Sequence, residues 1–346
     1  MNRGEVIRIA LTFNDLGGTY ARHAAVTMAS IFENTSSPVC VHVLHDDTLK
    51  QRNRAAFEEL AAEYGQQLLF HDVSESLDKT AFDLRKLGKK SQLTVGALFR
   101  LLMPQILECE KVIYLDCDIV VNTDIAELWN VPLDGKALGA VRDVWSLDCL
   151  EGKKIPWRLG KVWDLLGIAH DCYFNSGVLV MDLEKIRAEY DLLGSIGSFF
   201  AEYGKCITME DQDFLNCLFA DDKLLLDEKF NRIRTQGVTA DGVGGCIWHM
   251  ASGSAKPWTC YSRPFVDDLY WKYLRKTPYC TSDEELLHTA LTDLSASPLL
   301  HRHSGECTRR VFRQTYDNIF RAHIWTVPRI LYMLHKRARS SEARSL

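Results

Sequence analysis

Residues 6–73 alternate between short, β-rich apolar segments and helical segments, and this alternation restricts the fold more than any other feature of the chain. The pattern predicts strands at 6–13, 39–44 and 68–73, with helices at 20–33 and 47–64 between them. Parallel neighbours in a sheet need a long crossover, and a helix between consecutive strands supplies it. We therefore predict an α/β fold with a mostly parallel, mixed sheet and helices on both faces, whose ligands bind beyond the carboxyl ends of the strands.

The same two patterns continue to about residue 250. Further strands are predicted at 111–115, 137–141, 173–181, 223–226 and 246–250, and the run at 111–115 is apolar enough for a strand buried on both faces. Helices are predicted at 94–108, bent near Pro104, and at 183–203 and 211–219. Segment 143–172 is rich in Trp, Lys and Gly without a regular period, so we interpret it as a long excursion near the site, either a lid or an acceptor loop.

Composition is typical of a globular protein and argues against a nucleic-acid partner. Of the 346 residues, 47% are apolar and 25% charged, and the formal net charge is −5. Residues 301–346 contain ten lysines and arginines against three acidic residues, so the rest of the chain is strongly acidic, whereas a nucleic-acid-binding body is normally basic. The eleven cysteines include no C-x-x-C pair and are scattered through apolar segments, which is typical of a reducing cytosol.

The basic C-terminal region is predicted to associate with an anionic membrane surface. Residues 309–339 mix large apolar side chains with many arginines and are interrupted at Pro328, a pattern typical of paired amphipathic helices on lipid. The alternative is a helix packed on the body with solvated arginines. No apolar run reaches the roughly 18 residues of a membrane span, and 6–13 is too short for a signal peptide. We therefore divide the chain into a body, 1–275, and a membrane-associating region, 276–346, and expect a cytoplasmic protein held peripherally on the inner face of the cytoplasmic membrane.

Two carboxylates follow the strand predicted at 111–115. Asp116 and Asp118 stand two residues apart, and the two-residue period of extended chain turns both toward one side. A hard divalent cation such as Mn²⁺ or Mg²⁺ takes oxygen ligands of this kind and can be shared with a diphosphate, where it would neutralise charge on a departing nucleotide. The alternative is that both are ordinary polar residues where a strand reaches the surface.

His249 and Lys256 follow the last predicted strand. Imidazole is a suitable third ligand beside two carboxylates, so His249 is a candidate to complete the cation site. Lys256 lies on a turn of small residues that begins at Gly253, where its ammonium can reach a phosphate as a point charge. A histidine beside Trp248 is more often a core residue, and the neighbouring lysine is what favours the ligand interpretation.

Three further segments place polar groups in apolar surroundings. Thr208 is positioned to cap a helix whose first turn contains Asp211 and Gln212, at the positive end of the helix dipole, although Asp211 can equally be a partner in that cap alone. Asn175 precedes an apolar strand, where its amide can bond sugar hydroxyls or simply end a turn. Arg100 is a charge inside an apolar helix and needs a partner, either a ligand or a buried carboxylate.

Taken together, these segments resemble glycosyltransferase family 8, which includes the bacterial lipopolysaccharide galactosyl- and glucosyltransferases and the glycogenins. The resemblance extends from residue 6 to about residue 260 and includes the order and rough spacing of the motifs. It is carried by Phe13-Asn14-Asp15, Phe99-Arg100-Leu101, Tyr114-Leu115-Asp116-Cys117-Asp118, Phe174-Asn175-Ser176-Gly177, Asp211-Gln212-Asp213-Phe214-Leu215-Asn216 and His249 through Lys256-Pro257-Trp258. The loops from Asn14 to Tyr20 and from His249 to Lys256 are longer than in the family's pattern.

The resemblance implies an A-type, Rossmann-like nucleotide-diphospho-sugar transferase fold, with 1–275 as the catalytic domain. It also implies a Mn²⁺ ion, with Mg²⁺ as the alternative, and transfer of glucose or galactose from a UDP-sugar with retention at the anomeric carbon. The acceptor would be a saccharide, either a lipopolysaccharide core or another glycan. The implied metal ligands are Asp116, Asp118 and His249; the implied donor-binding residues are Asn14, Asp15, Arg100, Asp116, Cys117, Asn175, Asp211, Gly253 and Lys256; the implied catalytic residues are Gln212 and Asp211.

Gln212 falls where the family keeps a residue beside the reacting carbon, but an amide is a poor nucleophile. We therefore expect a front-face route, in which the departing diphosphate, stabilised by the cation and Lys256, helps to deprotonate the acceptor hydroxyl. Two other classes of protein remain open. A non-catalytic nucleotide-sugar binding protein would share the donor-binding residues, and a phosphohydrolase of the haloacid-dehalogenase type also has a D-x-D motif after an apolar strand, though normally nearer the N-terminus.

Overall fold

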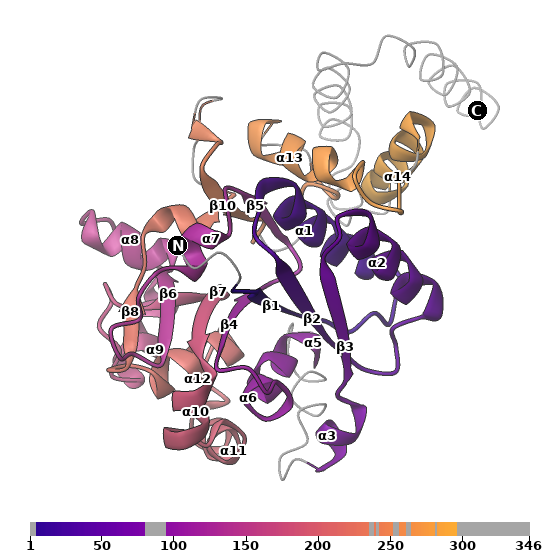
Figure 1. Cartoon of the computed structure of the whole chain (residues 1–346). Helices are drawn as coiled ribbons and strands as arrows, with labels where there is room; N and C mark the ends of the chain where they lie inside the picture. The colour runs from indigo at the N-terminus through magenta and orange to yellow at the C-terminus, as the bar shows by residue number, and fades with distance from the viewer. Residues whose placement is uncertain are drawn as a thin grey trace, which may run out of the picture.

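A seven-stranded sheet lies at the centre of the computed structural model, which describes residues 5–79, 95–234, 239, 242–251, 256–260, 264–280 and 282–295 (Figure 1). Its strands are β3 (Gln67–Asp72), β2 (Val39–His45), β1 (Ile7–Thr12), β4 (Lys111–Leu115), β7 (Phe174–Asp182), β6 (Leu138–Arg142) and β8 (Lys223–Leu225), in that spatial order. All neighbours are parallel except β7, which runs antiparallel to both β4 and β6. The predicted α/β fold with a mostly parallel sheet is confirmed.

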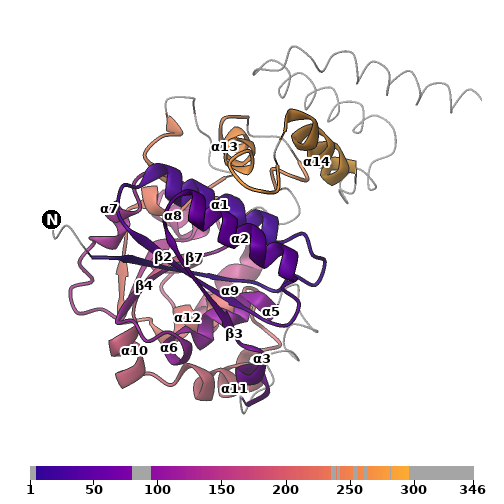
Figure 2. The ribbon, with the colours of Figure 1, turned by 45° about the vertical axis from the view of Figure 1, so that its right-hand side comes forward.

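The alternation of side chains along the strands divides the core into two layers. Ile9 and Leu11 of β1 pack in one apolar cluster with α1 (Ala21–Asn34) and α2 (Gln51–Glu63), whereas Ala10 faces the other cluster. That second cluster is formed by α5 (Val95–Leu98), the 3₁₀ helix η1 (Phe99–Leu102), α6 (Met103–Ile106), α10 (Leu183–Glu189), α11 (Leu192–Tyr203) and α12 (Glu210–Leu218). Figure 2 shows the helix pair α1 and α2 above the sheet and the second group below it. Both faces of the sheet are therefore covered, as predicted.

A second, three-stranded sheet brings distant parts of the chain together. It consists of β5 (Ile119–Asn122), β10 (Cys246–His249) and β9 (Arg232–Ile233) in the order β5-β10-β9. β5 follows β4 after a three-residue turn, and β10 pairs antiparallel with β5 so that His249 lies opposite Ile119. The β10 strand was predicted, but β5 and β9 were not, because each is too short to carry a periodic pattern.

The remaining helices lie at the periphery. They are α3 (Ser74–Lys79), α7 (Ala126–Trp129), α8 (Val144–Leu150), α9 (Trp157–Leu165), the 3₁₀ helix η2 (Glu228–Phe230), α13 (Pro264–Leu274) and α14 (Asp283–Ser295). α13 packs against α1. Cys280, between α13 and α14, is buried in the same apolar cluster as the α1 helix. The division of the chain after residue 275 stays a prediction.

Three predicted segments differ in detail from the structure. The helix predicted at 94–108 is three short pieces, and Pro104 stands at the beginning of α6 rather than at a bend within one helix. The helix predicted at 183–203 is interrupted at Tyr190, where the chain is extended, and a new helix begins with the Asp191 carboxylate accepting from the Gly194 amide. The excursion at 143–172 contains two helices, α8 and α9, whose apolar positions form a small cluster of their own.

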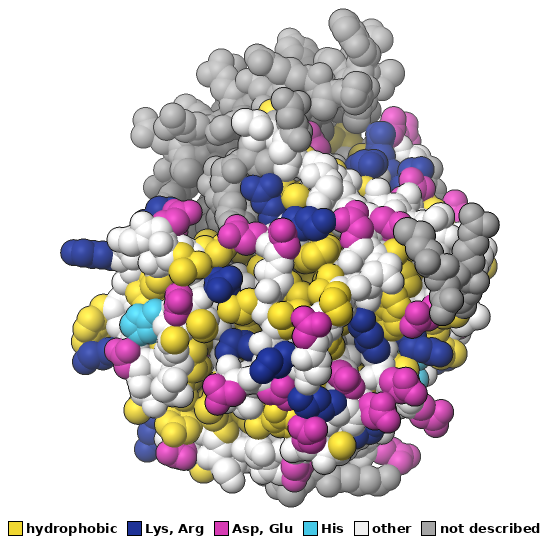
Figure 3. All heavy atoms as spheres, turned by 60° about the vertical axis from the view of Figure 1, so that its left-hand side comes forward, with side chains coloured by type: hydrophobic (Ala, Val, Ile, Leu, Met, Phe, Trp, Pro, Cys, Tyr) yellow, Lys and Arg dark blue, Asp and Glu magenta, His cyan; other side chains and the backbone are white. Residues whose placement is uncertain are grey.

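The C-terminal region is only partly described. The tail segment 309–339, on which the membrane-surface prediction depends, lies outside the described residues. Within the described ranges, no helix has both the length and the apolar character needed to cross a bilayer. Figure 3 shows one face of the molecule, on which acidic and basic side chains are interspersed with exposed apolar ones instead of forming a basic surface.

A buried and a half-buried histidine on adjacent strands make stability depend on pH. His42 of β2 and His71 of β3 are joined by a 3.0 Å contact between ring nitrogens. Burial, together with His71 and Arg8, lowers the pKa of His42 from 6.5 to about 4. The unfolded chain therefore binds a proton between these values that the folded chain does not, so the stability from this site is complete above about pH 6.5 and is lost as the pH falls toward 4.

We expect the free energy of unfolding to fall by up to about 2 kcal/mol between pH 6.5 and pH 4.5, after allowance for partial solvation of the ring. Urea unfolding midpoints measured across this range test the expectation. His42→Leu should flatten the slope, whereas His170→Gln, which changes a half-buried surface histidine, should leave it intact. An equal slope in His42→Leu and the unaltered protein would contradict the assignment.

Candidate active site

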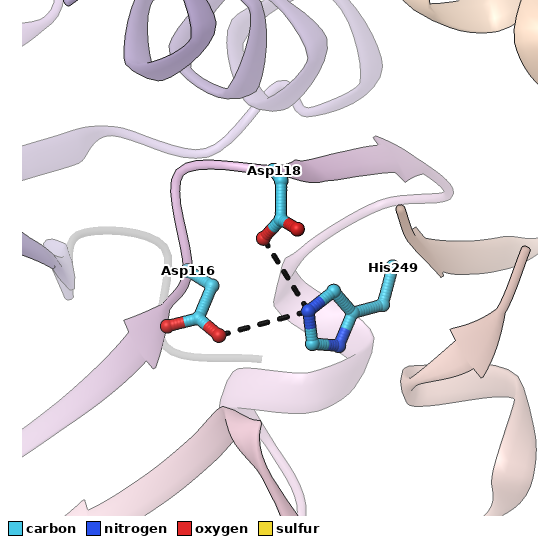
Figure 4. A group of neighbouring side chains, drawn as sticks. All are labelled: Asp116, Asp118 and His249. Carbon is cyan, nitrogen blue, oxygen red and sulfur yellow. Dashed lines mark ion pairs between the residues drawn. The ribbon is translucent and has the colours of Figure 1, made fainter. Parts of the chain in front are cut away.

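Two carboxylates lie on either side of the turn between β4 and β5. The turn is held by backbone bonds, in which the Asp116 amide donates to the Gly177 carbonyl at 2.8 Å and the Met250 amide donates to the Asp118 carbonyl at 2.9 Å. The Asp116 carboxylate accepts the Tyr114 hydroxyl at 2.5 Å. Both carboxylates are consequently fixed by the sheet below them and point to one side (Figure 4).

His249, at the end of β10, faces both carboxylates. Its Nε2 lies 3.6 Å from Asp116 Oδ2 and 3.3 Å from Asp118 Oδ1, as the dashed lines in Figure 4 mark. The other ring nitrogen, Nδ1, is 3.1 Å from the Asn231 amide oxygen, while the Asn231 amide nitrogen donates to Asn175. Because this oxygen can only accept, it holds the proton on Nδ1 and leaves the Nε2 lone pair directed at the acids.

The residue set fits a divalent cation. Single ligand atoms of Asp116, Asp118 and His249 all lie within 4.8 Å of one another. Two carboxylate oxygens and one oriented imidazole suit a hard or borderline divalent ion. Gly177 keeps the space between them open, because a Cβ there would lie 2.2 Å from His249 Cε1 and 2.9 Å from Asp116 Oδ2. This glycine is therefore required by a close approach of side chains to the backbone.

A lysine ammonium completes the charge pattern at Asp118. Lys256 Nζ contacts Asp118 Oδ2 directly. Burial raises the pKa of Asp118, but the charge of the adjoining Lys256 opposes this and holds that pKa below its usual range. Asp118 is therefore ionised at neutral pH although its side chain is only 8% exposed. Gly253, predicted to act with Lys256, lies outside the described residues.

Arg100 is paired with two carboxylates, the buried Asp211 and the partly exposed Asp116. From η1, its guanidinium donates to Asp116 Oδ1 at 3.0 Å and to the Ser176 carbonyl at 2.7 Å. Its Nε donates to the Ala97 carbonyl and also lies 3.3 Å from Asp211 Oδ2. Because the Arg100 Nε proton is donated to Ala97, Asp211 Oδ2 forms an ion pair with Arg100 but has no hydrogen-bond partner among the described residues. Burial raises the pKa of Asp211, and the nearby Arg100 opposes this effect.

The beginning of α12 differs from the predicted cap. The Thr208 side chain does not cap this helix; instead Asp213 Oδ2 accepts from the Thr208 and Met209 amides at 2.9 and 2.8 Å. Asp213 also accepts the Tyr173 hydroxyl at 2.6 Å and is fully buried. Asp211 lies in the first turn of the helix, as predicted. The carboxylate that accepts from amides at the start of the helix is that of Asp213, two residues further along the chain.

Asn175 and Gln212 both donate to the carboxylate of Asp143, a residue that was not among the predicted site residues. Asp143 Oδ2 accepts from the Asn175 amide at 3.2 Å and from the Gln212 amide at 3.4 Å. The Gln212 oxygen accepts from the Ser176 amide at 3.0 Å. Asp143 also caps α8 by accepting from the Trp145 amide, and an acid between a strand end and a helix start was the available signal. Asn231, which orients His249, carried no comparable signal.

The polar residues of the loop after β1 bond to neighbouring helices and loops. The buried Asp15 carboxylate accepts the Tyr20 amide at the start of α1 and the Asn53 side chain of α2, at 2.8 and 2.6 Å. Asn14 donates to Asp46 at 2.6 Å, and the buried Cys117 thiol is directed at the Thr12 carbonyl. Asn14, Asp15 and Cys117 therefore hold the loop and the adjacent turn, and their roles in donor binding stay predictions.

Tyr20, in the same loop, lies close to the acid pair. Although 36% of the residue is exposed, burial of its hydroxyl and the charges of Asp118 and Asp116 raise the pKa of that group above the usual value. The loop therefore brings an aromatic ring to the edge of the carboxylate site. The sequence analysis did not select this residue.

Comparisons with known proteins agree with this geometry. The model of glycosyl transferase family 8 matches residues 9–259, and the chain belongs to this family. Residues 9–259 contain the acid pair, His249 and Lys256, so the family match extends over the whole candidate site.

Individual relatives are more distant. The chain is 30% identical over 208 residues to glycosyltransferase GlyF of Streptococcus pneumoniae, a match that covers 58% of this chain and 46% of GlyF. It is also 30% identical over 210 residues to the lipopolysaccharide glucosyltransferase WaaO of Escherichia coli, covering 60% of this chain and 58% of WaaO. The chain thus spans about half the length of these relatives.

Among solved structures, the galactosyltransferase LgtC, in complex with donor and acceptor sugar analogues, matches with a TM-score of 0.64 at 23% identity. The match covers 82% of this chain and 100% of the LgtC chain. This likeness shows the A-type glycosyltransferase fold.

Proposed function

We propose that this glycosyltransferase moves a hexose, glucose or galactose, from a UDP-sugar to a saccharide acceptor, with retention at the anomeric carbon. The single observation that carries the proposal is the convergence of Asp116, Asp118 and His249, whose ligand atoms lie within 4.8 Å of one another beside the Lys256 ammonium. This arrangement supports binding of Mn²⁺, or Mg²⁺, together with a diphosphate. Bound there, the ion would supply electrostatic stabilisation of the charge that develops on the departing diphosphate.

The residues around the cation site divide by the part of the donor they would contact. Lys256 adjoins Asp118 and would bind the diphosphate with Gly253. Arg100, Asn175 and Asp211 would bind the donor sugar. Arg100 contacts both Asp116 and Asp211, which supports this assignment for the arginine and Asp211. Asn14, Asp15 and Cys117 would border the nucleotide.

Retention would follow from a front-face route. The Gln212 amide, in the network with Ser176 and Asp143, is a poor nucleophile, but it can orient groups at the reacting carbon. Asp211 is paired with Arg100 and is 6% exposed at its side chain, which limits its use as a nucleophile. The departing diphosphate, held by Lys256, would take the proton of the acceptor hydroxyl. Capture of a competent covalent glycosyl-enzyme on Asp211 would overturn this route.

The acceptor class is supported by relatives and by composition. WaaO is a lipopolysaccharide glucosyltransferase, and a similar acceptor, a lipopolysaccharide core or related cell-surface glycan, is proposed here. The basic, apolar sequence of residues 301–346 supports peripheral binding to an anionic lipid surface, where such acceptors are assembled. If a chain ending near residue 300 bound anionic vesicles as well as the full chain does, this part of the proposal would be wrong.

A donor screen tests the proposed function. We expect UDP-glucose or UDP-galactose to raise the melting temperature only when Mn²⁺ or Mg²⁺ is present, and UDP to be released slowly without acceptor. ADP-glucose serves as the matched control, because it differs from UDP-glucose only in the base, and GDP-mannose is a second control that differs in both base and sugar. Donor binding without any UDP release would instead indicate a nucleotide-sugar binding protein. Release of phosphate from simple phosphomonoesters without UDP affinity would indicate a phosphohydrolase.

A further inference from the structure

An aromatic cluster joins three distant segments next to the candidate site. His23 of α1 stacks on Trp258, with ring centroids 3.8 Å apart and planes inclined by 19°. Its Nδ1 lies 2.7 Å from the hydroxyl of Tyr270 in α13. Tyr270 in turn packs against Trp258 at 4.8 Å between ring centroids. His23 is 5% exposed, so the cluster is closed to solvent on the α1 side.

Trp258 belongs to the short turn that carries Lys256. The turn is internally closed, because the Thr259 hydroxyl accepts from the Lys256 amide at 2.9 Å while the Thr259 and Cys260 amides donate to the Lys256 carbonyl. Lys256 and Trp258 therefore move as one unit, and whatever holds the indole also places the start of the lysine side chain.

The same turn has a second attachment at its other end. The Cys260 carbonyl accepts from Arg234 at 2.6 Å, and Arg234 forms a buried ion pair with Asp267 of α13. The His23 contact thus fixes the middle of the five-residue unit 256–260, and the Arg234 contact fixes its end. Trp258, on which His23 stacks, is two residues from Lys256, whereas Cys260 is four residues away.

A lysine ammonium on a flexible stem binds a phosphate well only when its backbone is already in place. We propose that His23 is a positioning residue for diphosphate binding, because its stacking on Trp258 and its contact with Tyr270 hold the Lys256 turn against α1. This inference rests on the proposed function, in which Lys256 binds the diphosphate of the donor. His23 itself makes no contact with the three candidate metal ligands in the described hydrogen bonds and ion pairs.

A positioning role for His23 and a role in core packing alone predict different effects on diphosphate affinity. Loss of a core contact lowers stability without changing the affinity of a site elsewhere. Loss of the positioning contact also weakens diphosphate binding, because the turn must then be ordered when the ligand binds. His23→Ala is expected to raise the dissociation constant of UDP with Mn²⁺ by about tenfold, and His23→Phe, which keeps a ring against Trp258, by less.

The test measures UDP binding by calorimetry and amide hydrogen exchange of residues 256–260 in the ligand-free protein. Faster exchange in this turn is expected for His23→Ala. Phe32→Ala, a buried substitution on the same helix whose ring packs against Tyr64, is the control that should lose stability and keep UDP affinity. An unchanged UDP affinity in His23→Ala would overturn the proposal.

A double-mutant cycle with Lys256→Ala separates action through the lysine from other effects. If His23 acts by placing Lys256, His23→Ala adds no further loss of UDP affinity once the lysine side chain is gone. A full tenfold loss in the Lys256→Ala background would reject the positioning role. Absence of UDP binding to the unaltered protein with Mn²⁺ would instead reject the proposed function, and this inference with it.

Discussion

Asp118→Asn is expected to lower the rate of metal-dependent sugar transfer by about 10³-fold, because several kcal/mol of transition-state stabilisation depend on one ion. Asp118 faces His249 at 3.3 Å and contacts the Lys256 ammonium, so it links the cation site to the diphosphate position. An amide of the same shape removes the charge while leaving the turn between β4 and β5 unchanged. The measurement is UDP release and product formation at saturating Mn²⁺.

The matched control is Glu58→Gln, which changes an exposed carboxylate on α2 that pairs with Arg54. This variant should retain full activity. The melting temperature of Asp118→Asn should no longer respond to Mn²⁺ and UDP, although the ligand-free protein remains folded. A transfer rate within tenfold of the unaltered protein would show that Asp118 is not a ligand of the essential ion.

The second large effect is expected for Arg100→Met, which should lose both stability and activity. The Arg100 side chain is 4% exposed and neutralises Asp116 and Asp211, while also donating to the Ser176 carbonyl. Burial lowers the pKa of Arg100, but the nearby acids raise it by more than burial lowers it. The guanidinium is therefore charged at any accessible pH. Removing one partner of a buried ion pair costs about 3–5 kcal/mol, because the remaining charges are left buried.

For a catalytic body of this size, such a loss lowers the melting temperature by roughly 10 °C. Arg54→Met, at a half-exposed position of α2 that pairs with Glu58, is the control and should change neither quantity appreciably. Transfer assays at a temperature far below both melting points separate the two effects, and a fall of at least about 100-fold is expected there. A destabilised variant that retained normal transfer would limit Arg100 to a structural role. Arg100→Lys should also fail, because one ammonium cannot replace three directed contacts.

Local patterns were sufficient for much of the fold and for part of the site. The strand and helix order of residues 6–73 predicted parallel pairing, because apolar period and crossover length are properties of short segments. Asp116 and Asp118 were also found locally, since both lie within three residues of a strand end. Arg100 was identified as a charge that needed a partner, either a ligand or a buried carboxylate, and in the structure it is paired with Asp116 and Asp211.

Other features depend on contacts that no local pattern encodes. Asp143 meets Gln212 and Asn175 only because β6 ends where β7 and α12 begin. Asp15, which resembled a donor-binding residue, has both carboxylate oxygens occupied by α1 and α2. The helix predicted at 183–203 is broken where Asp191 satisfies a new helix end, a competition decided by packing on the sheet.

The amino-acid sequence alone therefore predicted an α/β sheet with an acid pair at the end of a buried strand, because strand period, crossover length and residue type are local quantities. His249 was only a candidate ligand in the sequence, and the tertiary structure decided that it faces that pair. It also decided that Asn231 contacts the His249 ring and that His23 stacks on Trp258 in the turn bearing Lys256. These contacts join residues more than a hundred positions apart or elements too short for a pattern. They exist only because β5 pairs with β10 and α13 packs on α1, and the free energy of those contacts comes from burial across the whole fold.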